Sequence, residues 1–111
     1  WLDNLLTKYS KKMFIIFQHS PIEPPREETK LSMLNTEKYR EILKKHSNIL
    51  LMSSGHYHQD SIKQDEDGIW HISAPAFIDN PHSYQMIKIT YDENKLKSLK
   101  DITIDVTKIK V

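Results

Sequence analysis

The sequence predicts a mixed α/β (α+β) fold, with a mixed sheet, two helices and a C-terminal β-meander. Two apolar runs, at residues 13–17 and 49–52, have the length of buried strands, and a loop and a helical pattern separate them. From about residue 60, short alternating segments and tight turns predict further strands. The 111 residues make up one domain or part of one, which we divide into a βα unit (1–58) and a β-meander (59–111).

The chain begins with an amphipathic pattern over residues 1–12, which predicts a helix. Its apolar residues recur at helical spacing, and its lysines fall in the last turns, where cations suit the helix dipole. The run at residues 13–17 then predicts a strand that is buried on both faces. Residues 20–34 carry three prolines and a charged stretch, so we expect a long exposed loop there.

A second helix is expected from residue 36 to about residue 46, with Asn35 or Thr36 as its cap. Its apolar stripe consists of Tyr39, Ile42 and Leu43. The run at residues 49–52 follows as the next strand. Because ligands of open α/β sheets usually bind beyond the carboxyl ends of the strands, the polar residues after both apolar runs are candidates for a site.

The second half of the chain is expected to be all β. The segment 65–68 is a hairpin signal, in which Gly68 can take a positive φ angle. Residues 84–91 and 96–106 alternate between apolar and polar side chains, which predicts two more strands. We expect all of these strands to join the first two in one mixed sheet.

The composition excludes several classes of protein. Sixteen Lys and Arg residues against 15 Asp and Glu residues give a net charge of +1, which argues against a dedicated nucleic-acid-binding domain. There is no cysteine to form a disulfide or a thiolate metal site, and two isolated glycines cannot form a glycine-rich phosphate loop. The longest apolar run has five residues, well short of the roughly 18 that a membrane span needs.

The residues that indicate chemistry are histidines. His56 and His58 are two residues apart, which is a common spacing for metal ligands, and we expect Gly55 to permit a backbone geometry that a side chain would block. His19 follows the preceding strand, so the three imidazoles converge at one edge if the two strands are parallel neighbours. Two solvated histidines on a strand have the same spacing, and this alternative stays open.

The other three histidines have simpler interpretations. His46 lies at a helix C-terminus, where a protonated imidazole interacts favourably with the dipole. His71 alternates with apolar neighbours and is expected on the polar face of a strand, and His82 is a candidate for substrate contact from a loop. Nothing indicates a serine nucleophile, because the chain has no G-x-S-x-G turn.

The order of these motifs resembles the C-terminal half of a calcineurin-like metallophosphoesterase domain. The first strand ends in the sequence Q-H-S-P at 18–21, and the second ends in S-G-H-Y-H at 54–58. The later stretch 68–76 resembles the family segment in which a strand leads into a short Pro-containing connection. The resemblance covers nearly the whole chain and implies the C-terminal portion of an α/β/β/α sandwich, a partial domain with a metal centre at one edge.

The resemblance also implies the roles of individual residues. His19 and His56 would bind one metal ion, and His58 would bind the other. Such a centre holds two divalent ions (Mn, Fe or Zn), which activate water for attack on a phosphate mono- or diester and neutralise charge on the phosphoryl oxygens. The family needs earlier D-x-H, G-D and G-N-H blocks, and none of them occurs here. We therefore expect no catalytic residue within this chain, an N-terminal half that supplies the rest, and no activity in isolation.

In this interpretation the substrate, a phosphate ester, meets Tyr57 and the loop at residues 20–34, where Arg26 or Lys30 contacts a phosphate. One alternative is a non-catalytic His-rich β module, which binds a single zinc ion or a protein partner through its sheet edges. Another is a remnant that self-associates through an uncovered face of the sandwich.

Overall fold

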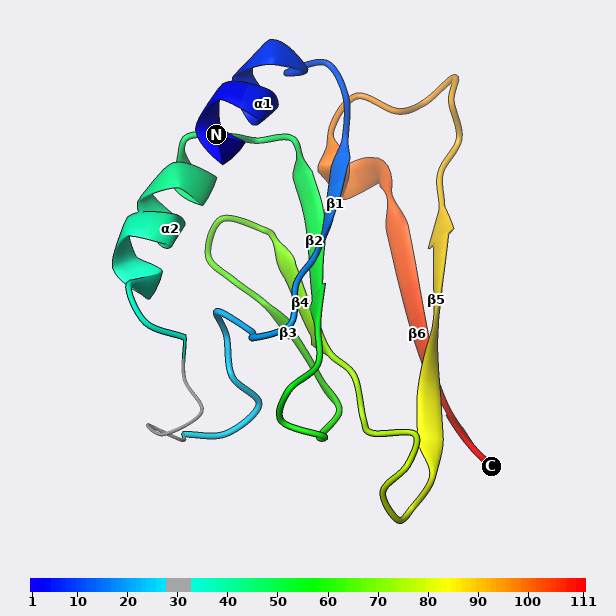
Figure 1. Ribbon diagram of the computed structural model, residues 1–111. Coiled ribbons are helices and arrows are strands. Elements are labelled where there is room, and N and C mark those ends of the chain that lie inside the picture. Colours follow the sequence, from blue (N-terminus) through cyan, green and yellow to red (C-terminus); the bar gives the residue numbers. More distant parts are fainter. Residues whose placement is uncertain (28–32) are drawn as a thin grey trace.

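The computed structural model describes residues 1–27 and 33–111, which form three layers (Figure 1). Two helices cover one face of a four-stranded sheet, and a two-stranded sheet packs against the other face. The elements are α1 (Leu2–Lys8), β1 (Phe14–Phe17), α2 (Thr36–Lys44), β2 (Ile49–Ser54), β3 (Ser61–Gln64), β4 (Trp70–Ser73), β5 (Ser83–Thr90), the 3-10 helix η1 (Leu99–Asp101) and β6 (Thr103–Lys110). The mixed α/β class is confirmed.

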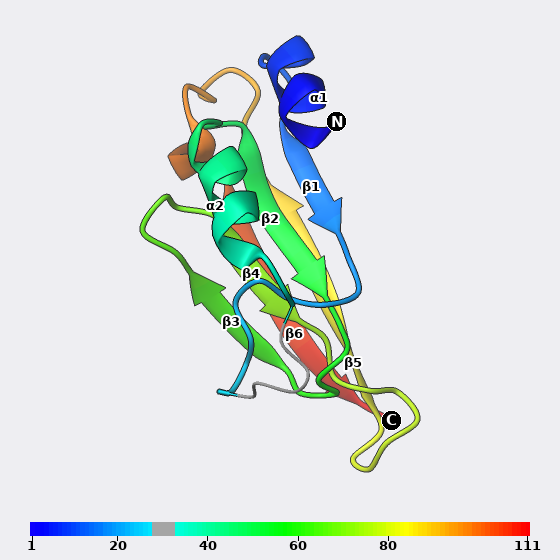
Figure 2. The same ribbon diagram turned by 60° about the vertical axis from the view of Figure 1, so that its left-hand side comes forward.

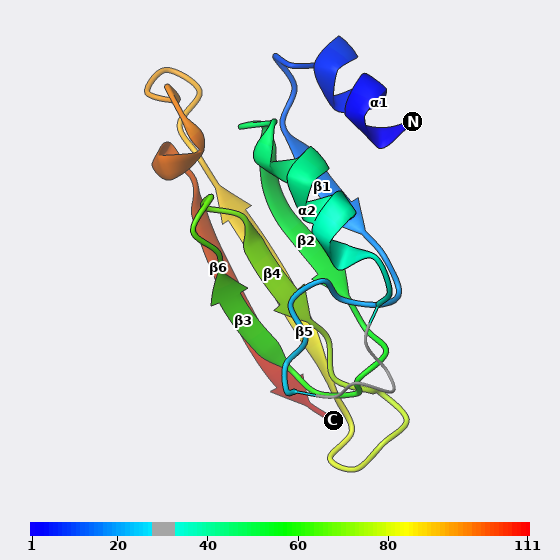
Figure 3. The same cartoon turned by 90° about the vertical axis from the view of Figure 1, so that its left-hand side faces the viewer.

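In the larger sheet the carboxyl ends of three parallel strands lie on the same side. Its order is β1-β2-β4-β3, with β1, β2 and β4 parallel and β3 antiparallel to β4. Figure 2 shows β1, β2 and β4 running in the same direction. Strands β5 and β6 pair only with each other, so the expectation of one mixed sheet is wrong. Figure 3 shows this second sheet lying behind the first.

Helix α1 ends at Lys8, four residues before the end that the amphipathic pattern predicts. The side-chain amide of Asn48 donates to the carbonyls of Leu6, Tyr9 and Lys12, at 3.4, 3.3 and 3.0 Å. These bonds satisfy carbonyls at and beyond the helix end, and so they stabilise the turn that leads into β1. Helix α2 follows Asn35, one of the two predicted caps, whose side chain makes no capping hydrogen bond, and it ends at Lys44.

The central strand β2 is buried on both faces, with exposed fractions of 1–3% for Ile49 to Met52, as the apolar run predicts. Residue Phe14 pairs with Ile49 but Ile15 pairs with Leu51, which leaves Leu50 as an extra residue in a β-bulge. Because of this bulge, Leu50 and Leu51 both join the core between the two sheets, whereas Ile49 and Met52 join the core beneath the helices.

Strand β1 is buried on one face only, so the expectation that both of its faces are buried is wrong. Phe14 and Ile16 pack into the core beneath the helices. Ile15 is 40% exposed and Phe17 is 77% exposed, because β1 is the edge strand and no residue of it reaches the core between the sheets. This edge therefore presents apolar side chains and backbone groups that no other strand in residues 1–27 and 33–111 pairs with.

The second half contains two hairpins. Gly68 has a φ angle of 86° in the turn between β3 and β4, as the hairpin signal predicts. Strand β6 begins seven residues later than the predicted segment 96–106, because Ser98 and Asp101 form a capping box that closes η1. The backbone amides of Lys97 and Ser98 donate to Asp101 and lower the pKa of its carboxyl. Across the described ranges, neither α-helix has the length and hydropathy to cross a membrane.

Candidate metal centre

His19 and His56 lie on the two loops that leave the carboxyl ends of β1 and β2, and these loops remain paired beyond the strands. The amide of Gln18 donates to the carbonyl of Ser53, and the amide of Gly55 donates to the carbonyl of His19, both at 3.0 Å. His19 Nε2 and His56 Nδ1 lie 2.8 Å apart, with the two rings at an angle of 77°. The parallel pairing of β1 and β2 therefore brings two imidazoles together.

Helix α2 fixes the start of the loop that carries His19. The Tyr39 hydroxyl donates to Gln18 Oε1 at 2.8 Å, and Gln18 Nε2 donates to the carbonyl of Ser20 at 2.6 Å. Burial raises the pKa of the Tyr39 hydroxyl, so this group stays protonated and keeps donating at neutral pH. The position of His19 is thus set from both sides, by β2 and by α2.

The backbone at His56 and His58 is left-handed, with φ angles of 69° and 56°. The amide of Tyr57 donates to the carbonyl of Gly55 at 2.8 Å, which closes a γ-turn around His56, a rare and strained turn when φ is positive. Such positions cost on the order of 1–3 kcal/mol each and cluster at functional sites. The expectation for Gly55 is wrong, because a Cβ there would meet no atom within 4 Å.

His58 contacts a different partner. Its Nδ1 lies 2.5 Å from Oδ2 of Asp79, and both side chains are about half-exposed. Asp79 belongs to the loop between β4 and β5, which lies at the same end of the molecule as the turn after β2 (Figures 1 and 2). The structure therefore brings His19 and His56 together and places His58 in a separate pair. Residues 1–27 and 33–111 contain no group of three or more His, Cys, Asp or Glu side chains placed to hold one ion.

The ring nitrogens of His19 and His56 fit part of the ligand set of a metal ion and do not complete it. Two nitrogens bound at about 2.1 Å to one tetrahedral or octahedral ion lie about 3.0–3.4 Å apart. The 2.8 Å between His19 Nε2 and His56 Nδ1 is slightly shorter than that separation, so the two rings would have to move apart to hold an ion between them. Because a closed structural zinc site has four protein ligands, these two imidazoles need ligands from elsewhere.

Tyr57 is only 5% exposed, and it lies beneath an exposed cation. The guanidinium carbon of Arg26 is 6.0 Å from the centre of the Tyr57 ring, within the range of a cation–π contact, and the His56 ring meets Tyr57 edge-on at 5.7 Å. The other predicted phosphate contact, Lys30, lies outside the described residues. Arg26 therefore lies next to the turn that carries His56, and its guanidinium packs over the Tyr57 ring.

Two of the remaining histidines have local partners. His46 Nε2 lies 2.7 Å from Asp3 Oδ1, and the His46 side chain is 10% exposed. This pair joins α2 to α1, and it lowers the pKa of the Asp3 carboxyl, with a smaller contribution from Lys45. His82 Nδ1 donates to the carbonyl of Phe77 at 3.0 Å within its own loop.

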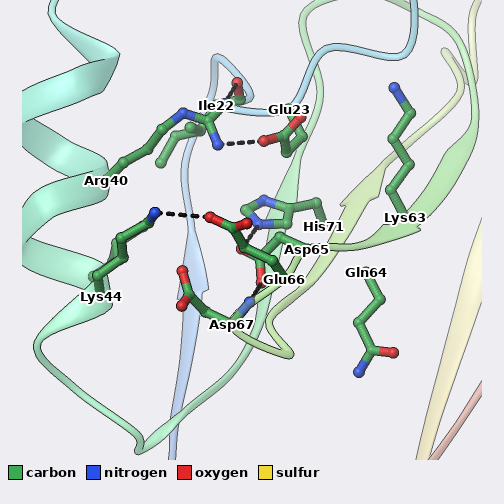
Figure 4. A pocket seen from close by; sticks show the side chains of 11 residues that line it. Ile22, Glu23, Arg40, Lys44, Lys63, Gln64, Asp65, Glu66, Asp67 and His71 are labelled. Atoms are coloured by element: carbon green, nitrogen blue, oxygen red, sulfur yellow. Dashed lines mark hydrogen bonds and ion pairs between the residues drawn. The ribbon is translucent and has the colours of Figure 1, made fainter.

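The third, His71, is 5% exposed, so the expectation that it lies on a polar strand face is wrong. It lines a cavity of about 350 Å³ between α2 and the β3–β4 hairpin, where its ring faces the carboxylate of Asp65 (Figure 4). Three pairs of side chains line this cavity: His71 with Asp65 at 2.8 Å, Lys44 with Glu66 at 2.8 Å, and Arg40 with Glu23. Of these three pairs, Lys44–Glu66 joins α2 to the β3–β4 hairpin, Arg40–Glu23 joins α2 to the loop after β1, and His71–Asp65 lies within the hairpin.

Comparison with known proteins supports a phosphoesterase relationship. No family model matches the sequence. The chain is 26% identical over 94 residues to a manganese-dependent ADP-ribose/CDP-alcohol diphosphatase from Xenopus laevis, an alignment that covers 82% of this chain and 26% of that protein. It shares the fold of a dimetal phosphatase from Danio rerio, with a TM-score of 0.68 and 23% identity over 94% of this chain and 35% of the other. The resemblance drawn from the motifs is therefore confirmed, for a chain that spans about a quarter to a third of these relatives.

Proposed function

We propose that this chain carries part of the metal centre of a metal-dependent phosphoesterase, in which His19 and His56 hold one divalent ion and His58 holds a second. The observation that carries the proposal is the 2.8 Å approach of His19 Nε2 to His56 Nδ1 at the carboxyl edge of parallel strands. The names of both relatives support a metal-dependent phosphoesterase, and Mn, Fe and Zn are the candidate ions. Bound divalent ions supply electrostatic stabilisation of the charge that develops on a phosphoryl oxygen.

The chain's own residues hold the ions and receive the substrate. His19 and His56 present their ring nitrogens from loops that are fixed by backbone pairing, and Gln18 keeps the first loop in place through Tyr39. Arg26 is exposed and forms no ion pair within the described ranges, so its guanidinium is available to a phosphate. In this proposal Tyr57 contributes to substrate binding by supporting Arg26.

We propose that an N-terminal half of the domain supplies the remaining ligands and the catalytic groups, and that the 111-residue chain alone is inactive. Two surfaces support this proposal. The edge strand β1 exposes Ile15 and Phe17, and the outer face of β5 exposes Tyr84 and Met86 at 45% and 55%. Large apolar side chains on a strand edge and a sheet face are typical of surfaces that another part of a domain covers.

The substrate in this proposal is a phosphate mono- or diester. The Xenopus relative is named for ADP-ribose and CDP-alcohols, which share a diphosphate linkage. These are therefore the first compounds to test on the chain after it is combined with an N-terminal half, and the chain alone should leave both unchanged.

A titration with Zn²⁺, followed by NMR through the ring signals of the six histidines, tests the centre directly. We expect the signals of His19, His56 and His58 to shift together while the other three stay in place. A weak drift of all six signals, or no shift at all, would contradict the proposal.

Two variants make this titration specific. His56→Gln removes a proposed ligand and should abolish the shift of His19. His82→Gln is the matched control, because His82 is an exposed loop residue whose ring bonds to the carbonyl of Phe77. If His82→Gln weakens zinc binding as much as His56→Gln does, the assignment of ligands is wrong.

The alternative is a non-catalytic module that binds a single zinc ion or a protein partner. It is favoured by one observation, namely that the described residues bring only two imidazoles together. A zinc stoichiometry of one, with no further ion bound after an N-terminal half is added, supports this alternative over the dinuclear centre.

A further inference from the structure

His56 and His58 each contact a neighbouring side chain through ring atom Nδ1, but the two partners differ in chemistry. His56 Nδ1 faces a second imidazole nitrogen, His19 Nε2, at 2.8 Å. His58 Nδ1 faces a carboxylate oxygen of Asp79 at 2.5 Å. A carboxylate accepts hydrogen bonds and does not donate them, so His58 Nδ1 must carry the proton in this pair.

The proton on His58 Nδ1 decides which nitrogen of that ring remains for a ligand. In a neutral imidazole one nitrogen carries a hydrogen and the other keeps a free lone pair. His58 therefore offers Nε2. His56 faces its own partner through Nδ1, and an ion held between His56 and His19 would replace the single proton that this 2.8 Å contact shares. The two histidines of the pair thus present different nitrogens, which is how neighbours two residues apart can serve two different ions.

We propose that Asp79 is a positioning residue that holds His58 in the Nδ1–H tautomer and so leaves Nε2 as its ligating nitrogen. The inference rests on the proposed function in so far as His58 is a metal ligand. A carboxylate that accepts from the free N–H of a ligating histidine orients the ring and raises its basicity, and loss of such a partner typically weakens metal binding roughly 10–100-fold.

The surroundings of His58 make this contact decisive. Its backbone is left-handed at φ 56°, its side chain is 55% exposed, and among the described residues Asp79 is its side-chain partner. Packing therefore does not fix the ring. This hydrogen bond joins residues 21 positions apart and connects the loop between β4 and β5 to the turn after β2.

The first experiment needs no metal. Long-range ¹H–¹⁵N NMR of the metal-free 111-residue chain, at a pH where the imidazoles are neutral, reports the tautomer of each histidine. We expect the Nδ1–H form at His58 in the unmodified chain, a shift toward the Nε2–H form in Asp79→Ala, and recovery in Asp79→Glu. Asp105→Ala is the matched control, because Asp105 is an exposed carboxylate on β6. An unchanged tautomer in Asp79→Ala overturns the proposal.

The second experiment measures Zn²⁺ affinity by calorimetry on the same four proteins. Asp79→Ala should weaken zinc binding at His58 roughly 10–100-fold, and Asp79→Glu should restore most of the affinity. In the NMR titration of Asp79→Ala, the ring signals of His19 and His56 should still respond to zinc. If Asp79→Ala abolishes binding while the His58 tautomer stays the same, Asp79 is itself a ligand and the positioning role is wrong. If the unmodified chain binds no zinc, the proposed function fails, whereas the tautomer still decides the role of Asp79.

Discussion

The backbone of His56 sets the order of stability among its substitutions. At a φ angle of 69°, a side chain with a Cβ is strained and glycine is not. His56→Gly and His56→Ala both remove the imidazole, so their difference isolates the backbone. We expect the Gly variant to be the more stable by about 1 kcal/mol, the reverse of the usual order. Urea denaturation of the two variants measures this difference, and an Ala variant of equal or greater stability would show that the γ-turn does not form.

Sequence reasoning found the three candidate ligands but not their setting. The spacing of His56 and His58 is visible in the sequence, and so is the place of His19 after an apolar run. The left-handed backbone is not visible in the sequence, because most histidines have a negative φ angle and the positive φ angles fall at His56 and His58 rather than at Gly55. Asp79 was missed because its contact with His58 crosses 21 positions of the chain and depends on how a loop folds back.

Among the elements, the β3–β4 hairpin depends on one carboxylate. Asp65 Oδ1 accepts from the amides of Asp67 and Ile69 at 3.0 and 2.9 Å, and Oδ2 accepts from the buried ring of His71. Asp65→Ala leaves a buried imidazole without its partner and should lower the free energy of unfolding by about 2–3 kcal/mol. Thermal denaturation measures the loss. The control is Asp67→Asn, on an exposed neighbour whose carboxylate makes no hydrogen bond within the described ranges, and an equal loss there would contradict the assignment.

The junction of α1 and α2 should weaken in acid. The hydrogen bond from His46, and to a smaller extent the charge of Lys45, lower the pKa of Asp3 below its ordinary 3.8. A carboxyl whose pKa is lower in the folded state contributes stability that is complete above pH 3.8 and is lost as the pH falls through its folded value. Asp3→Asn should therefore flatten the fall in stability below pH 3.8, as measured by denaturation across pH. Asp105→Asn serves as the control, and an equal flattening there would contradict the prediction.

The elements themselves were largely predictable, because their apolar periods are clear. Both helices, the first two strands and the hairpin at Gly68 lie where the sequence places them, with ends that local hydrogen bonds adjust. The sequence could not assign β5 and β6 to a separate sheet, because alternation predicts which face of a strand is apolar and not which neighbour it joins. For the same reason the sequence does not predict the burial of His71, whose partner Asp65 lies on the other side of the hairpin turn.

For the whole molecule, the exposed edge of β1 predicts association. Phe17 is 77% exposed on an edge strand, a surface that favours pairing with another chain. The isolated chain should self-associate at high concentration, and Phe17→Lys should reduce this, as measured by sedimentation velocity. Leu34→Lys is the control, because Leu34 is 84% exposed but lies outside any strand. Equal suppression by both variants would mean that general hydrophobicity, and not the strand edge, causes the association.

Strand β1 has two roles that cannot be separated. One edge pairs with β2 and the other pairs with no strand of the described residues, while its carboxyl end leads to His19. Any strand that docks on this other edge therefore also restrains the position of His19. In the proposed centre, assembly of the domain and capture of metal become linked equilibria, and each strengthens the other by the same factor. A chelator should then loosen the assembled domain, and the unaccompanied chain should compete poorly for scarce metal against other ligands in a cell.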